Sequence, residues 1–596
     1  MDLRTREGRR EQGKRLQQAV ERAGLTVEEL ANRLGCSRAL IYQYVSGSTL
    51  AQPDRLQQIA AICNVPLTYF YADTVEALEE KPEPTQEPIA IRLAESLRAL
   101  QELAAAQAGP PDQRALVLTC ERIVSLTDQL GDRAAQVRAQ EQLGNALLAC
   151  GENLRAADAL TRAIALASEL GDTQTELAAR QSLGKALWGL GRIEEARAQF
   201  SIVANSSLPS ARWRGLLALG SLHEQFGEFA EAMRYFEEAN SVLDSLDQGD
   251  GLEARIGRLY VNTNQRNVYM ACGDFANARA LAETCLYEAE QLGNADQHLE
   301  ARFDLAWIDF ATGRWKEAYT GWTATLQLAR FLGDQRRETL SRAWLGIFFA
   351  AAGDFNTAIQ HGKDALAQAL SRGDRQAELY AQLALTDAYI GLSGRLPEAR
   401  YHVAQAHAVA ASVRYAGSSI ECQLRSTRLS LAEGQAGAAR EAAQNALNDA
   451  AKLGARHLEA LARVRLAEAL RQQSKDPQTL RQAQEHAERA LALAQETGFL
   501  EATWRAHHLL ALLGLDLAAP NLQEVEEHWN QAIRLLNQLR STLQEAQLPD
   551  TLLENEDCLA VYAGYANLLH SQNRRQEREA FLEQTSWPPL LDRLEH

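Results

Sequence analysis

Apolar and small residues recur along most of the chain at the spacing of amphipathic helices, and short breaks that contain glycine divide these helical runs. Two glycine series interleave. The first comprises Gly131, Gly171, Gly249, Gly293, Gly333, Gly373, Gly454 and Gly498, with breaks at Pro209 and Gly417 in its gaps. The second comprises Gly151, Gly191, Gly227, Gly273, Gly313, Gly353, Gly394 and Gly434. The pattern predicts pairs of antiparallel helices that repeat about every 41 residues.

The residues that follow each glycine of the second series are also regular. The fifth residue is always alanine: Ala156, Ala196, Ala232, Ala278, Ala318, Ala358, Ala399 and Ala439. The twelfth residue is small throughout: Ala163, Val203, Ala239, Cys285, Thr325, Ala365, Ala406 and Ala446. Neighbouring helices approach closely where side chains are small, so these sites are expected at the contacts between helices.

This repeat resembles the tetratricopeptide (TPR) family, in a variety of about 40 residues. The resemblance covers eight repeats at residues 133–454 and two degenerate repeats at 455–546. Capping helices are expected at 88–132 and 547–596. The resemblance implies a right-handed superhelix whose concave groove, lined by the first helix of each pair, binds a ligand.

Composition agrees with an all-α fold, since apolar residues make up 46% and aromatic residues only 6% of the 596 residues. The longest apolar stretch, residues 344–353, is about half the length that spans a bilayer. The basic N-terminus is not followed by an apolar segment. We therefore expect a cytoplasmic protein without a membrane partner. The eight cysteines form no Cys-x-x-Cys pair and are expected to be buried thiols.

Residues 1–71 have a different pattern, which predicts five short helices. Thr26 and Glu29 form a capping box that starts the second helix, and Ser37 is a suitable N-cap for the third. Pro53 is expected at the start of the fourth helix, and a short fifth helix follows Val65. Residues 72–87 are acidic, contain prolines and predict an extended linker.

The central segment of this head, LTVEELANRLGCSRALIYQYVSG, resembles the bacterial Cro/C1-type (XRE) helix-turn-helix family. The resemblance implies that residues 1–71 bind duplex DNA, with the third helix in the major groove. The positions that match the DNA-contacting residues are Ser37, Arg38, Ala39, Tyr42, Gln43 and Ser46. Arg38 suits a guanine and Gln43 an adenine. Val45 and Ala51 depart from the family pattern, in which glutamate and proline are frequent. The alternative is a helix-turn-helix that serves only as a folded interaction module.

Charge separates the head from the rest of the chain. Residues 1–71 contain ten Arg and Lys against seven Asp and Glu, which gives a net charge of +3. The whole chain has a net charge of −17, so the remaining residues carry −20. A basic head on an acidic body is typical of a nucleic-acid-binding module attached to a domain that repels DNA.

The sequence contains no complete motif for catalysis, metal binding or cofactor binding. Gly8, Gly13 and Lys14 match a phosphate-binding loop, but Arg15 stands where Ser or Thr must follow. The histidine pairs 507/508 and 402/407 lack a third ligand at metal spacing. We expect no enzyme activity, no metal and no cofactor.

The fourth repeat is unusual, because the segment Asn262 to Asn267 replaces the Leu-Gly or Leu-Ala of five other repeats. Asparagine amides can hold a peptide backbone, and neighbouring aromatic residues can form an apolar pocket. We therefore predict a ligand groove formed by Asn264, Asn267, Phe303, Trp307 and Phe310. The alternative is a solvated helix face beside aromatic residues that pack between repeats.

This domain order resembles that of the peptide-responsive bacterial regulators called RRNPP. It implies a DNA-binding transcriptional regulator whose TPR body binds a peptide or protein effector and controls the heads. A homodimer is expected because such heads bind paired half-sites. The candidate interface, or else the cap of the last repeat, comprises Leu552, Leu553, Val561, Tyr562, Tyr565, Leu568 and Leu569. The alternative function is an interaction scaffold.

Overall fold

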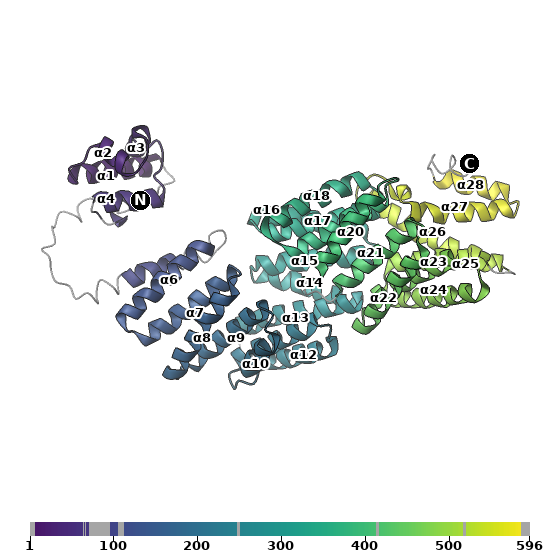
Figure 1. Ribbon diagram of the computed structural model, residues 1–596, viewed down its shortest axis with the longest axis horizontal. Helices are drawn as coiled ribbons and strands as arrows, with labels where there is room; N and C mark the ends of the chain where they lie inside the picture. Colours follow the sequence, from purple (N-terminus) through teal and green to yellow (C-terminus); the bar gives the residue numbers. More distant parts are fainter. Residues whose placement is uncertain are drawn as a thin grey trace. The chain divides into compact units, whose positions relative to one another are not determined.

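The computed structural model describes residues 6–63, 65, 67–70, 96–104, 113–246, 251–412, 417–516 and 520–585 (Figure 1). The described residues form helices and no strands. The chain divides into two compact units, residues 1–92 and 93–596. The linker predicted at 72–87 lies outside the described residues.

The first unit has the five helices that the sequence predicts. They are α1 (Arg6–Arg22), α2 (Val27–Arg33), α3 (Arg38–Val45), α4 (Pro53–Cys63) and the 3-10 helix η1 (Leu67–Phe70). The Thr26 side chain accepts a hydrogen bond from the Glu29 amide and completes the capping box, and Ser37 caps α3. The fully buried side chains of Leu16, Leu30, Ile41, Leu56 and Phe70 form the core.

Gly13 lies where α1 packs against the end of α3. This close packing explains why residue 13, in the segment that matches a phosphate-binding loop, is a glycine. A Cβ on Gly13 would lie 2.7 Å from the carbonyl oxygen of Tyr44. Since α1 is helical through Gly13, Lys14 and Arg15, this segment forms no loop that could surround a phosphate.

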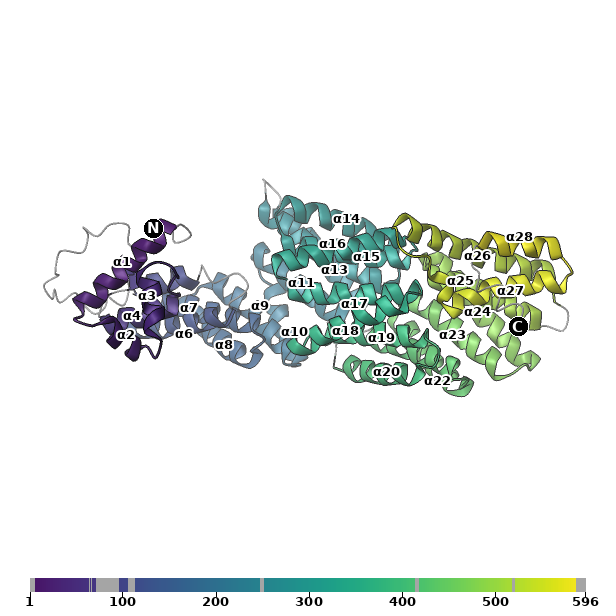
Figure 2. The same cartoon turned by 90° about the horizontal axis from the view of Figure 1, so that it is seen from above.

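The second unit is an array of antiparallel helix pairs (Figures 1 and 2). The first helices of the pairs are α7 (Arg133–Ala149), α9 (Thr173–Gly189), α11 (Pro209–Gln225), α13 (Leu252–Cys272), α15 (Ala295–Ala311), α17 (Gln335–Ala351), α19 (Arg375–Ile390), α21 (Ser418–Ala432), α23 (Arg456–Gln473) and α25 (Leu500–Asp516). The second helices are α8 (Asn153–Leu170), α10 (Ile193–Ala204), α12 (Phe229–Leu246), α14 (Phe275–Gln291), α16 (Trp315–Leu332), α18 (Phe355–Arg372), α20 (Leu396–Ala410), α22 (Ala436–Leu453), α24 (Pro477–Thr497) and α26 (Leu522–Glu545). A helix at 96–104 and α6 (Gln113–Leu130) precede the array, and η3 (Leu552–Glu554), α27 (Glu556–Ser571) and α28 (Arg575–Thr585) follow it.

The repeat pattern read from the sequence describes this array well. All eight glycines of the second series have a positive φ, between 73° and 86°, and a helix begins two residues after each of them. The eight alanines at the fifth position are all 0% exposed, because they lie where the helices of neighbouring pairs meet. The predicted fold class is confirmed: an all-α chain with a helix-turn-helix head and a TPR superhelix.

Three turns of the array contact segments from the C-terminal part of the chain. A Cβ on Gly273 would lie 2.9 Å from Nδ1 of His457, and one on Gly313 would lie 3.3 Å from Cγ of Leu500. One on Gly353 would lie 2.9 Å from the carbonyl carbon of Thr551. At the corresponding turn glycines 151, 394 and 434, no atom lies within 4 Å of the Cβ position. The superhelix therefore closes on itself, and we call the contact of residues 273, 313 and 353 with residues 457, 500 and 551–555 the seam.

Polar contacts add to the seam. The Thr551 hydroxyl donates a hydrogen bond of 2.9 Å to the carbonyl oxygen of Ala352, and Lys316 pairs with Glu545 at 3.3 Å. Helices α16 and α26 lie against each other at the same place (Figure 2). The array is thus held by long-range contacts in addition to contacts between neighbouring repeats.

The C-terminal helices cap the array. Of the apolar residues suggested as a dimer interface, all but the half-buried Tyr565 are 2% exposed or less, namely Leu552, Leu553, Val561, Tyr562, Leu568 and Leu569. Because they are already covered within one chain, these six side chains offer no surface to a second copy. Within the described ranges, no helix is long and apolar enough to cross a membrane.

Candidate functional site

The outer face of α3 presents the residues expected to contact DNA. Ser37, Arg38, Ala39, Tyr42, Gln43 and Ser46 are not buried, while Ile41 and Tyr44 on the opposite face are. Four exposed side chains of α3 and its two capping serines therefore form one surface, in which all but Ala39 are polar. This surface has the size and polarity of a helix that enters the major groove.

Two contacts preorganise this surface. Arg38 donates from Nη1 to Glu28 at 3.1 Å, although both side chains are more than half exposed. An exposed ion pair of this kind contributes little to stability, so the arginine can exchange Glu28 for a base. The Ser46 hydroxyl donates to the carbonyl oxygen of Gln43 at 3.1 Å and contacts the Ser48 hydroxyl at 2.8 Å, which fixes the end of the helix.

In the body, the two asparagines of the predicted groove are hydrogen-bonded to other side chains, and Asn264 joins two helices in this way. Asn264 accepts from the Ser221 hydroxyl at 2.8 Å and donates to the carbonyl oxygen of Tyr260 at 2.8 Å. Asn267 accepts from Arg266 at 3.2 Å. Phe303 packs on Trp322, with 6.5 Å between the ring centroids. These three residues are not brought together with Trp307 and Phe310 around one cavity.

Arg266 explains the unusual sequence of the fourth repeat. Arg266 lies seven residues before the turn glycine of its repeat. In the first three repeats this position is a glycine that packs on an apolar side chain, as Gly184 does on Phe200. Arg266 is 0% exposed and pairs with Asp304 and, at 3.5 Å, with Glu300. At the position of Phe200 the fourth repeat has Ala282, which leaves room for the longer side chain.

Further charged groups join this buried network. Arg337 donates to Glu300 at 3.0 Å. Burial raises the pKa of Asp304 to about 6 against the opposing effect of Arg266. Burial also raises the pKa of Glu224 to about 8, with Arg266 opposing and Glu300 adding to the rise. Arg266 of the fourth repeat is therefore part of an internal ion network between repeats.

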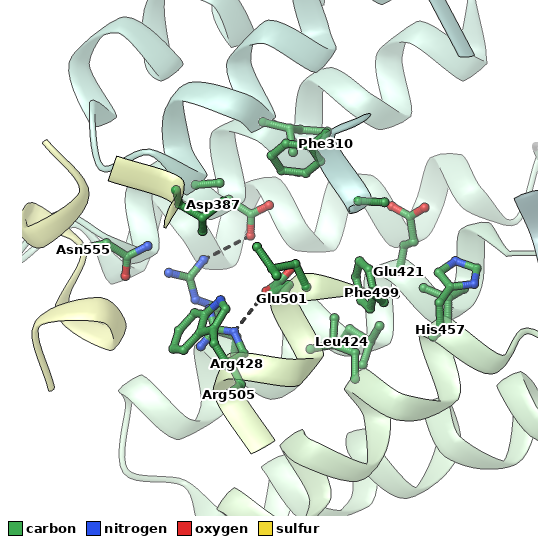
Figure 3. A pocket seen from close by; sticks show the side chains of 18 of the residues that line it. Phe310, Asp387, Glu421, Leu424, Arg428, His457, Phe499, Glu501, Arg505 and Asn555 are labelled. Carbon is green, nitrogen blue, oxygen red and sulfur yellow. Dashed lines mark hydrogen bonds and ion pairs between the residues drawn. The ribbon is translucent and has the colours of Figure 1, made fainter. Parts of the chain in front are cut away.

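Trp307 and Phe310 line a cavity of about 160 Å³ between the first helices of later repeats, which we call the chamber (Figure 3). One wall is aromatic and consists of Trp307, Phe310, Trp315, Trp344, Phe499 and Trp504. Phe310 stacks on Trp315 at 5.7 Å between centroids. Apolar contact surface thus dominates one end of the chamber.

The other end of the chamber is charged. Arg428 pairs with Asp387 at 3.3 Å (Figure 3). It also pairs with Asp557 at 3.6 Å. Arg505 pairs with Glu501 at 3.1 Å and with Asp557 at 2.8 Å. Burial pushes the pKa of Asp557 up, but its arginine neighbours, Arg505 first, outweigh burial and hold that pKa well below its usual range. Arginines and carboxylates thus alternate at this end of the chamber.

His457 belongs to the aromatic wall. Its ring lies 5.4 Å from Phe275, 6.0 Å from Trp307 and 5.7 Å from Phe499, measured between centroids. Burial lowers its pKa to about 3, so the imidazole is neutral at physiological pH. In the described ranges no three His, Cys, Asp or Glu side chains come together as a metal site.

Part of this chamber follows the period of the repeat. Six residues before the turn glycines lie Trp307, Ile347 and Arg428, and all three line the cavity. The residues that sequence reasoning missed come from the degenerate repeats and the C-terminal cap, chiefly Arg465, Arg505 and Asn555. No periodic signal marks these positions, because the seam brings them to the chamber from the far end of the array.

Comparison with known proteins adds to the geometry of the head. Residues 11–68 match the family profile described as helix-turn-helix domain. The head is a helix-turn-helix domain. No curated protein matches the chain.

Solved structures similar to the chain have low sequence identity. A Rap protein complexed with competence and sporulation factor is 12% identical, with a TM-score of 0.42, over 68% of this chain and 99% of that one. The hetero-tetramer Cut9-Hcn1 of the APC/C is 14% identical, with a TM-score of 0.49, over 85% of this chain and 97% of that one. The apo form of RapI is 13% identical, with a TM-score of 0.39, over 60% and 98%.

Proposed function

We propose that the protein is a transcriptional regulator that binds duplex DNA through α3 of its helix-turn-helix domain. The observation that carries this proposal is the exposed polar face of α3, which joins Arg38, Tyr42 and Gln43 on a compact domain. Arg38 would contact guanine O6 and N7, and Gln43 would contact adenine N6 and N7. The net charge of +3 in residues 1–71 favours this approach to the phosphate backbone.

The TPR body would bind a peptide or protein effector and control the heads. The inner face formed by the first helices of the pairs supports this role, because such faces offer a large surface for a ligand. We also propose a homodimer, because one short recognition helix gives limited affinity and two heads can bind half-sites one DNA turn apart. Sedimentation of the full chain with and without DNA tests the dimer, and a monomer in both would contradict it.

Selection of duplex DNA from a random library on the full-length protein tests the DNA-binding role. Arg38→Ala should weaken binding to the selected site by about 1 to 3 kcal/mol, since a bidentate base contact is worth that much. Arg33→Ala, which removes an exposed arginine of α2 and the same charge, is the matched control. If both variants lose affinity equally, Arg38 reads no base. If no duplex is enriched at low salt, the domain is an interaction module and the protein is a scaffold.

A further inference from the structure

The chamber meets a second, larger pocket of about 560 Å³, and five residues line both. These residues are Arg428, Arg465, Trp504, Arg505 and Asn555. The shared residues therefore form a corner that faces the aromatic chamber on one side and the wider pocket on the other. Four of the five carry N–H donors at the ends of their side chains.

Donors are left over in this corner, and each carboxylate that lines the chamber, Asp387, Glu421 and Glu501, accepts from at least one arginine. Arg465 is 5% exposed and donates to Glu468 through Nη1 at 2.8 Å, and its other N–H groups have no hydrogen-bond partner among the described residues. Asn555, also 5% exposed, caps α27 through its Oδ1, which leaves its Nδ2 without a partner in the same set of residues. The carboxylates of Asp387, Glu501 and Asp557 already accept from arginines.

An anionic group complements unpaired donors that are buried together. A carboxylate can accept two parallel N–H bonds from a guanidinium and another from an amide. Burial strengthens these bonds because water does not compete for them. The neighbouring aromatic wall complements a flat apolar group.

The size of the chamber limits what can enter. A cavity of about 150 Å³ with apolar walls holds one benzene molecule. The chamber, at about 160 Å³, therefore takes one ring. Polar atoms attached to the ring would extend into the corner of Arg428, Arg465 and Asn555.

We propose that the chamber is a binding site for a small organic anion, with an aromatic ring between Trp307, Phe310 and Trp504 and a carboxylate at Arg465, Arg428 and Asn555. The chamber is one part of the inner face proposed for a peptide or protein effector, and the anion proposal does not depend on that role. Its walls come from α15 on one side of the seam and from α23, α25 and α27 on the other. A bound anion therefore contacts both sides of the seam.

Titration calorimetry of the full chain with phenylacetate tests the proposal. Phenylacetamide and benzylamine are probes of nearly the same size that are neutral and cationic, and phenyl phosphate replaces the carboxylate by a phosphate. Phenylacetate or phenyl phosphate should bind at least about tenfold more tightly than phenylacetamide and benzylamine. Whichever of the two anions binds more tightly identifies the acidic group that the site prefers.

Variants distinguish the chamber from other sites on the protein. Arg465→Met should reduce phenylacetate affinity by about tenfold or more, and Arg465→Lys should restore part of it. Arg463→Met, on the same helix but paired with Glu459 outside the chamber, should leave the affinity unchanged. Ala351→Leu fills the chamber without changing its charge and should abolish binding even if Arg465→Met fails to fold.

Two outcomes would overturn the proposal. One is that no anionic probe binds at millimolar concentration, and the other is that phenylacetamide binds as tightly as phenylacetate. Because these measurements use no DNA, a failure here is distinct from a failure of the DNA-binding role, which the selection experiment measures.

Discussion

Replacing Gly353 with alanine should open the seam. Gly353 has a φ of 86°, and a Cβ there would clash with the carbonyl oxygen of Thr551 and lie 3.4 Å from the amide nitrogen of Asn555. Gly434 occupies the same turn of a later repeat, with a φ of 73° and nothing within 4 Å of its Cβ position. The two substitutions therefore cause the same backbone strain, and only Gly353→Ala also pushes η3 away.

The two contributions can be separated in magnitude. Alanine in the left-handed region costs about 1 to 2 kcal/mol, which applies to both variants. Overpacking against backbone adds about 1 to 3 kcal/mol in Gly353→Ala alone. The difference is equivalent to a roughly 5- to 150-fold change in the equilibrium between closed and open seam.

Hydrogen exchange of the full chain measures this equilibrium locally, which suits a repeat array that does not unfold in two states. The amides of Glu554 and Asn555 are bonded to Thr551 and Leu552 in the closed seam. Their exchange should accelerate by the factor given above in Gly353→Ala and stay unchanged in Gly434→Ala. Equal protection of residues 551–555 in both variants would refute the seam as a structural element.

Two further predictions concern the buried network of the fourth repeat. Arg266→Met should destabilise the packing of α13 on α15 by about 3 to 5 kcal/mol, measured by hydrogen exchange of the amides of these two helices, because it leaves buried carboxylates without their partner. Arg255→Met, which breaks the exposed pair with Glu288, should cost less than about 1 kcal/mol, and similar losses in the two variants would contradict the burial argument. Glu224→Gln should remove a pH dependence of stability. The raised pKa of Glu224 means that the folded protein favours the uncharged carboxyl group. The stability of the wild type relative to the glutamine variant is therefore greatest below pH 4.5 and falls as pH rises through about 8. At about 1.4 kcal/mol per pKa unit, this loss is at most about 5 kcal/mol, and parallel pH profiles of the two proteins would show that the pKa of Glu224 is the same in the folded and unfolded states.

The sequence was sufficient to predict the elements that repeat. A turn glycine, an alanine at the fifth position after it and a small residue at the twelfth describe a local unit, and local units are visible as a period. The helix-turn-helix domain was predictable for a similar reason, since the Thr26 capping box and the Ser37 cap are short-range signals.

The remaining features depend on contacts between distant segments. The seam joins turns of the middle repeats to the degenerate repeats and the C-terminal cap, and nothing in the repeat period specifies which repeats meet. The polar character of the fourth repeat was visible in the sequence. Its role was not, because Asp304 and Glu300, the partners of Arg266, lie on α15, the first helix of the following pair. Trp307 and Phe310 stand out in the sequence because aromatic residues are rare in this chain, whereas Arg465 lies in a degenerate repeat among many arginines.

The seam and the chamber should be linked thermodynamically, because the chamber is complete only when the seam is closed. A ligand that contacts α15 and α27 at once binds the closed form in preference to the open one. Linkage is reciprocal. The factor by which bound phenylacetate shifts the equilibrium towards the closed seam equals the factor by which opening the seam lowers the affinity for phenylacetate. Gly353→Ala should therefore bind phenylacetate more weakly than Gly434→Ala, and saturating phenylacetate should restore the protection of residues 551–555 in Gly353→Ala. If the two glycine variants bind phenylacetate equally while only one of them exchanges rapidly, the ligand touches one side of the seam alone and the chamber does not depend on closure.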